Sequence, residues 1–154
     1  MPKVEEKHID HVLNILEIGE KEKAMLFQVV HDDYPAHWAH IKSEYKKSFT
    51  AAEFDLLDFG MFIILASTIS AGATTDFNTF LEREEKNYEF IDDKSVSSIE
   101  IFLEAKVDKV EQSDLILFII DYLYHEEQEL PAITVNLIAL VLLSVVESIV
   151  EKEK

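Results

Sequence analysis

Two pairs of histidines in this chain have a spacing that could bind a metal ion. His8 and His11 are three residues apart, and His37 and His40 repeat that interval. Side chains three residues apart lie on one face of an α-helix, so each pair could direct two imidazoles toward one ion. If the pairs lay on facing helices, they could together bind Zn²⁺ or another divalent metal. The alternative is four half-buried or exposed histidines without a ligand.

The residues before the second pair have an explanation that needs no function. Proline suits the first turn of a helix, because its missing N–H would have had no partner there, and Pro35 predicts such a start. Asp32 and Asp33 precede it, where the helix dipole favours negative charge. These residues therefore indicate the beginning of a helix. We expect no cofactor, unless the histidine pairs bind a metal ion.

A third group with chemical potential lies near the C-terminus. Asp121, His125 and Glu129 are four residues apart and share one helix face. A carboxylate and an imidazole at this spacing could transfer a proton, or could form an ordinary charge pair on a wet surface. The sequence has no G-x-S-x-G, no phosphate-binding glycine loop and no H-E-x-x-H. Because Arg83 is the single arginine, tight binding of an anionic metabolite is also disfavoured, and these observations point away from an enzyme.

The elements that would position these residues are helices. Apolar residues recur at helical spacing in the first half of the chain, and they predict helices over about 4–18, 21–31 and 35–47. Thr50 and Glu53 fit a capping box at the start of a fourth helix. That helix is apolar nearly all round as far as Gly72, so it should lie inside the protein.

The second half continues the helical pattern. We expect a fifth helix capped by Thr74 or Thr75, a connection over 90–98, a sixth element over 98–107, a seventh helix from Gln112 or Ser113, and a last helix from Pro131 to about Val150. The sixth element also fits a strand, because its apolar residues alternate. The uncharged run over 130–146 is short for a membrane span, which needs about 20 apolar residues, so a buried helix is the better interpretation.

The predicted fold is all-α: a compact single-domain bundle of about seven helices, with apolar central helices near 54–71 and 131–150. A chain of 154 residues is long enough for one domain with a real core. Three glycines and three prolines leave few breakers to interrupt long helices. We therefore expect one helical domain over residues 1–154.

The charge balance limits the partners. The chain has 31 carboxylates and 14 Lys and Arg residues, for a formal charge of −17. Such a surface repels nucleic-acid phosphates and anionic lipids, so we expect neither nucleic acid nor membrane as a partner. The chain has no cysteine, and its N-terminus lacks the apolar segment of a secretory signal, so a cytoplasmic location is expected.

The negative charge is concentrated near the C-terminus. No Lys or Arg occurs from Val110 to Glu151. The sequence therefore predicts a non-enzymatic acidic binding protein, similar in kind to an immunity protein or an inhibitor, that engages a basic partner protein. The expected contact residues are Asp121, Glu126, Glu127 and Glu129. The alternatives are a metal-binding bundle that uses the histidine pairs, and a homo-oligomer with a subunit interface on the helix over 131–150.

Overall fold

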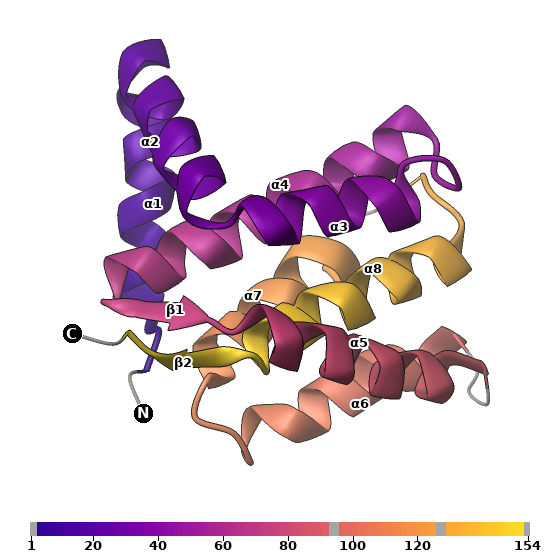
Figure 1. Ribbon diagram of the computed structural model, residues 1–154. Coiled ribbons are helices and arrows are strands. Elements are labelled where there is room, and N and C mark those ends of the chain that lie inside the picture. Colours follow the sequence, from indigo (N-terminus) through magenta and orange to yellow (C-terminus); the bar gives the residue numbers. More distant parts are fainter. Residues whose placement is uncertain (1–2, 93–95, 126–128, 153–154) are drawn as a thin grey trace.

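The computed structural model describes residues 3–92, 96–125 and 129–152, and helices make up most of them (Figure 1). In chain order the elements are α1 (Glu6–Ile18), α2 (Glu20–Asp33), α3 (Pro35–Tyr45), α4 (Ala51–Ser70), β1 (Ala73–Thr75), α5 (Phe77–Asp92), α6 (Val96–Val107), α7 (Ser113–Tyr124), α8 (Ala132–Val146) and β2 (Ile149–Glu151). The all-α prediction is confirmed, with eight helices in the described residues where about seven were expected.

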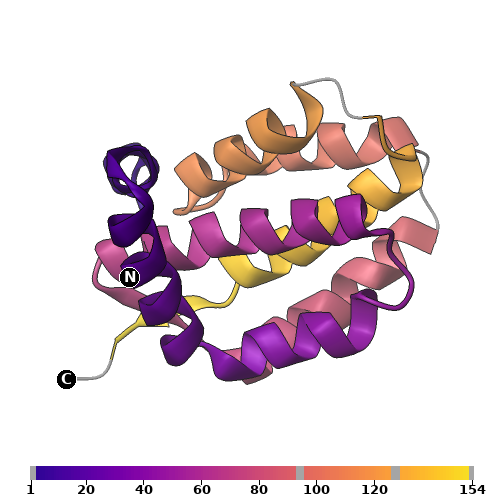
Figure 2. The same ribbon diagram turned by 90° about the horizontal axis from the view of Figure 1, so that it is seen from above.

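Helices α4 and α8 form the centre of the bundle, as their composition predicted. Figure 2 shows them between α6 and α7 on one side and α3 and α5 on the other. Every residue of α4 from Gly60 to Thr68 is buried, and so is most of α8. A helix that is apolar on all sides must be covered on all sides, and each large side chain hidden this way contributes about 1.5–3 kcal/mol.

The last helix is shorter than expected, and a small sheet replaces its end. Helix α8 stops at Val146, and β2 pairs with β1 in antiparallel register, with Thr75 opposite Ile149. Gly72, with a φ of +76°, ends α4 and turns the chain into β1. The left-handed region is accessible to glycine at little cost, which explains why this turn lies here.

The predicted helix starts are partly confirmed. The Thr50 Oγ1 atom accepts the Glu53 N–H at 3.2 Å, and the Glu53 carboxylate accepts the Thr50 N–H at 2.7 Å, so the capping box of α4 is present. Thr74 and Thr75 do not cap α5, because both lie in β1. Asp76 takes that role, and its carboxylate accepts the N–H of Thr79 at 2.9 Å.

The region over 90–107 is more helical than the sequence suggested. Helix α5 reaches Asp92 and α6 begins at Val96, so most of the expected connection over 90–98 is helix, and residues 93–95 lie outside the described part. The strand alternative for the sixth element is wrong. Ile99 and Leu103 of α6 are buried while Ile101 is 62 % exposed, a pattern that follows the helical repeat.

Helices α1 and α2 pack side by side at one end of the bundle, across the direction of α4 (Figure 1). Ile9 and Val12 of α1 are buried. Ahead of α1, the Val4 N–H donates to the Gln112 Oε1 atom at 2.8 Å. This hydrogen bond ties the first residues of the chain to the start of α7.

Within the described ranges, no helix is both long enough and apolar enough to cross a membrane. Helix α8, from the uncharged run, has 15 residues, whereas a span needs about 20. The same helix was the subunit interface in the homo-oligomer alternative. Contacts with α4, α5, α6 and α7 cover it within its own chain, so its composition is no longer a reason to expect a second copy.

Candidate functional site

A groove between α1 and α7 combines negative charge with an exposed apolar floor. It encloses about 350 Å³, and we call it the acidic groove. Helix α1 supplies Glu6, Ile9, Asp10 and Leu13, and α7 supplies Asp114, Leu117, Phe118 and Asp121. The hydrogen bond from the Glu6 N–H to the Asp114 Oδ2 atom, at 2.9 Å, joins the two helices at one end of the groove.

Helical spacing explains how each side of the acidic groove presents both kinds of side chain. Glu6 and Asp10 are four residues apart on α1, and Ile9 and Leu13 follow the same interval on the adjoining strip. Leu13 is 36 % exposed and Leu117 is 44 % exposed, so the floor is only partly covered by the chain itself. Four carboxylates therefore surround apolar surface that remains in contact with water.

The charge of the acidic groove is not balanced by cations in its walls. Among the described residues that line it, none is Lys or Arg. Asp121 does contact one basic side chain, the ring of His125, with 2.6 Å between Oδ1 and Nδ1. Both side chains are more than half exposed, so this is a surface contact between a carboxylate and an imidazole four residues apart on one helix face.

The structure places two of the expected contact residues in different parts of the surface. Asp121 lines the acidic groove, whereas Glu129 lines a separate shallow hollow with Asp55 and Tyr122. Glu126 and Glu127 lie outside the described residues. Glu6 and Asp10 could not be predicted as groove residues from the sequence, because α1 carries charges of both signs and only the fold brings its acidic strip beside α7.

One histidine of the first pair, His8, helps to begin α1. The His8 Nδ1 atom accepts the N–H of Glu5 at 2.9 Å, which completes a capping box. A ring that accepts at Nδ1 and is neutral carries its proton on the other nitrogen, so in this state His8 offers no free lone pair to a metal. His11 lies exposed on the same helix.

The second pair is bound to neighbours from distant parts of the chain. His37 is buried, with its Nε2 atom 2.8 Å from the Thr75 Oγ1 atom and its ring stacked on Phe80. The His40 Nε2 atom lies 2.8 Å from the Glu84 Oε1 atom. Burial lowers the pKa of His37 to about 4, and the positive charge that His40 can carry acts in the same direction, so the ring is neutral near pH 7.

Glu84 connects His40 to two tyrosines. The Tyr45 hydroxyl donates to the Glu84 Oε2 atom at 2.7 Å, and the Tyr88 hydroxyl donates to that of Tyr45. Burial raises the pKa of Tyr88 to about 12, and the pKa of Tyr45 is raised as well, first of all by burial. Both hydroxyls therefore keep their protons and act as hydrogen-bond donors, which holds α3 to α5.

In the part of the chain that the structure describes, no three His, Asp or Glu side chains come together as they would around a metal ion. The ligands predicted from spacing make other contacts: His8 caps α1, His37 contacts Thr75 and His40 contacts Glu84. The acidic groove is therefore the stronger candidate for function.

No protein-family model, curated protein or solved structure matches this chain. The all-α fold comes from the structure itself, and any function has to be argued from the geometry and charge of its surface.

Proposed function

We propose that this protein is a non-enzymatic binding protein that engages a basic partner protein through the acidic groove, in the manner of an immunity protein or an inhibitor. The observation that carries the proposal is the composition of the groove. Four carboxylates surround a partly exposed apolar floor, and no Lys or Arg among the described residues lines it.

The two kinds of side chain have different roles in this proposal. The carboxylates attract a basic partner and orient it as it approaches, and they disfavour acidic ones. The apolar floor supplies affinity, because Leu13 and Leu117 lose contact with water when a partner covers them. An acidic surface alone would attract many basic molecules, so the floor is what makes the site selective.

The size of the groove indicates what part of a partner it accepts. About 350 Å³ is at the lower end of the roughly 300–1,000 Å³ that binding pockets cover. A few large apolar side chains fit in that space, whereas a whole helix does not. The matching segment is an amphipathic helix that inserts apolar side chains into the floor and places Lys or Arg beside Asp10 and Asp121.

A defined peptide tests the proposal. The probe is a fluorescent amphipathic helix made of leucine and lysine, and the measurement is its fluorescence anisotropy as the full chain is added at low salt. We expect D10N/D121N to weaken binding about tenfold, because two charge pairs with the peptide are lost. Both positions are exposed, so the variant should fold.

The matched control removes the same charge elsewhere. E82Q/E85Q also lowers the negative charge by two, at exposed positions of α5 outside the groove, and should bind within about twofold of the unaltered protein. Equal weakening by both variants would mean that only net charge matters. If a peptide of lysine and serine with the same charge bound as tightly, the apolar floor would have no role.

A further inference from the structure

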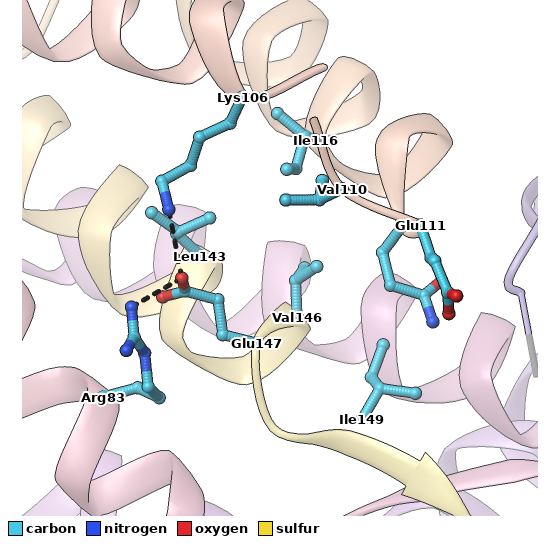
Figure 3. Close-up of a pocket in the computed structure, with 10 residues that line it drawn as sticks. Arg83, Lys106, Val110, Glu111, Ile116, Leu143, Val146, Glu147 and Ile149 are labelled. Carbon is cyan, nitrogen blue, oxygen red and sulfur yellow. Dashed lines mark hydrogen bonds and ion pairs between the residues drawn. The ribbon is translucent and has the colours of Figure 1, made fainter. Parts of the chain in front are cut away.

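A second hollow lies on another part of the molecule, at the junction of five elements (Figure 3). It encloses about 470 Å³. Its apolar walls come from Val110, Ile116, Leu143, Val146 and Ile149, and its polar side chains are Arg83, Lys106, Glu111, Gln112 and Glu147. We call it the Lys106 pocket. A mainly apolar hollow with a few converging polar groups is the usual form of a small-molecule site.

Three of the four charged side chains that line the Lys106 pocket gather on one wall (Figure 3). The Arg83 Nη2 atom donates to the Glu147 Oε2 atom at 2.8 Å, and the Lys106 Nζ atom lies 3.3 Å from the same oxygen. The Asn87 Nδ2 atom donates to the other carboxylate oxygen at 2.9 Å. Two cations thus share one carboxylate, so this wall has a surplus of one positive charge, while Glu111 lines the pocket on the side away from it (Figure 3).

The donors on this wall exceed the acceptors that the described residues provide. The Arg83 Nε atom is buried and has no hydrogen-bond partner among the residues that the structure describes. Lys106 makes the longer of the two contacts to Glu147 and is 22 % exposed, so its ammonium can reach a second anion. Burial by itself would raise the pKa of Glu147, but Asn87, Arg83 and Lys106 together lower it, so this carboxylate stays ionised and its bonds stay occupied.

From this geometry we infer that the Lys106 pocket binds a small amphipathic monocarboxylate, such as a medium-chain fatty acid anion. Its carboxylate pairs with Lys106 beside Arg83, and its hydrocarbon chain lies against Val110, Leu143 and Val146. Figure 3 shows these three side chains beside the charged wall. The proposal is independent of the acidic groove, which shares no residue with this pocket.

The charge distribution favours a monocarboxylate over related ligands that carry a different charge. A dianion such as a phosphate monoester would bring two negative charges to the one positive charge that Glu147 leaves unbalanced on this wall, and Glu111 would repel it as well. An alkylamine on the charged wall would bring a cation next to Arg83 and Lys106, where both oxygens of Glu147 already accept hydrogen bonds, and pairing with Glu111 would draw it away from this wall. A neutral alcohol would use the apolar wall and gain nothing from Lys106.

The test uses three probes of equal chain length on the full chain: octanoate, 1-octanol and octylamine. Two-dimensional amide NMR spectra report where each one binds. We expect octanoate to give saturable shifts at millimolar concentration, confined to residues near 83, 106, 110–116 and 143–149. The alcohol should bind at least about tenfold more weakly, because it lacks the charge-assisted hydrogen bond. The amine should give no saturable shift there.

Two variants locate the interaction. Lys106→Met keeps the aliphatic stem and removes the ammonium, and it should weaken octanoate binding about tenfold. Lys109→Met makes the same change at an exposed position three residues further along the chain and should bind as the unaltered protein does. Val110→Trp fills the mouth of the pocket from a partly exposed position, so it should block octanoate while the protein stays folded.

Three results would overturn the proposal. The first is the absence of saturable octanoate shifts at these residues. The second is equal binding of octanoate and octylamine, which would mean that the charged wall does not distinguish an anionic from a cationic ligand. The third is an equal loss for Lys106→Met and Lys109→Met, which would make the effect one of net charge.

Discussion

His37 is kept neutral by its surroundings. Phe77 and Phe80 lie against its ring, and Thr75 is hydrogen-bonded to it, so a charge on the ring would be poorly solvated. The pKa of the folded state, about 4, is lower than the usual value of 6.5. This difference makes the stability of the protein depend on pH in a defined window.

We expect buried His37 to lower the free energy of unfolding as the pH falls from about 6.5 to 4. In that window the unfolded chain binds a proton at His37 and the folded chain does not, so unfolding becomes more favourable. The free energy of unfolding has its full value with respect to His37 above the pKa of the unfolded chain. Up to about 3 kcal/mol of it is lost by the lower end of the pH window. Urea denaturation at several pH values should show a shallower pH dependence for His37→Gln. An unchanged pH dependence would contradict the assignment.

Glu84 has the larger effect on stability at neutral pH. Glu84→Ala would leave the buried Tyr45 hydroxyl without its acceptor and His40 without its partner, which should lower the free energy of unfolding by about 2–4 kcal/mol. Glu84→Gln keeps an oxygen for Tyr45 and should lose about half as much. Urea denaturation near pH 7 measures both.

The control for Glu84 is its neighbour on the same helix. Glu85 is exposed, and Glu85→Ala should change the free energy of unfolding by less than about 0.5 kcal/mol. A loss at Glu84→Ala no larger than at Glu85→Ala would show that the network of Glu84, His40 and the tyrosines does not stabilise the fold.

At the scale of single residues, the sequence did not predict the hydrogen-bond partners that the structure gives to the second histidine pair. The spacing of His37 and His40 suggested ligands for one ion, but their hydrogen-bond partners lie 38 and 44 residues away along the chain. Helical periodicity shows which residues share a face, and it contains no information on which distant residue packs against that face.

Gly60 allows the central helices to approach closely. A Cβ atom at this position would lie 2.9 Å from Leu142 of α8 and 2.9 Å from the ring of Tyr122 of α7. The Tyr122 hydroxyl donates to the backbone oxygen of Leu56 at 2.7 Å, so its ring is not free to move away. The spacing between α4 and its two neighbours thus depends on the absence of a side chain.

We expect Gly60→Ala to lower the free energy of unfolding by about 1–2 kcal/mol, because overpacking outweighs the gain of up to about 1 kcal/mol in helix propensity. Thermal or urea denaturation gives the sign directly. A double-mutant cycle with Leu142→Ala isolates the contact, since truncation of Leu142 should relieve part of the overpacking. A stabilised Gly60→Ala protein would contradict this description of the core.

At the scale of elements, the sequence predicted the features that depend on local composition. The capping residues of α4 and the apolar character of α4 and α8 are local, and both predictions are confirmed. Strand β2 was missed because Ile149 and Val150 keep the helical spacing of the apolar residues before them, Val145 and Val146. The extended conformation of β2 depends on pairing with β1, far away in the sequence.

At the scale of the whole molecule, the net negative charge could be predicted from the sequence. Its distribution over the surface could be predicted only in part. The acidic character of the C-terminal region follows from counting, and Asp121 was identified that way. The acidic groove needs α1 beside α7, and the contacts that hold them there join residues 108 apart in the chain. Only the fold assembles its two walls.

We propose that a basic amphipathic helix docks over the acidic groove and inserts apolar side chains into it, and amide NMR mapping with the leucine and lysine peptide tests this most directly. We expect the largest shifts at residues 6–13 and 114–121, on both walls of the groove, with a marked decrease in D10N/D121N. Shifts spread over all acidic surfaces, or concentrated on α5 and α3, would contradict the claim.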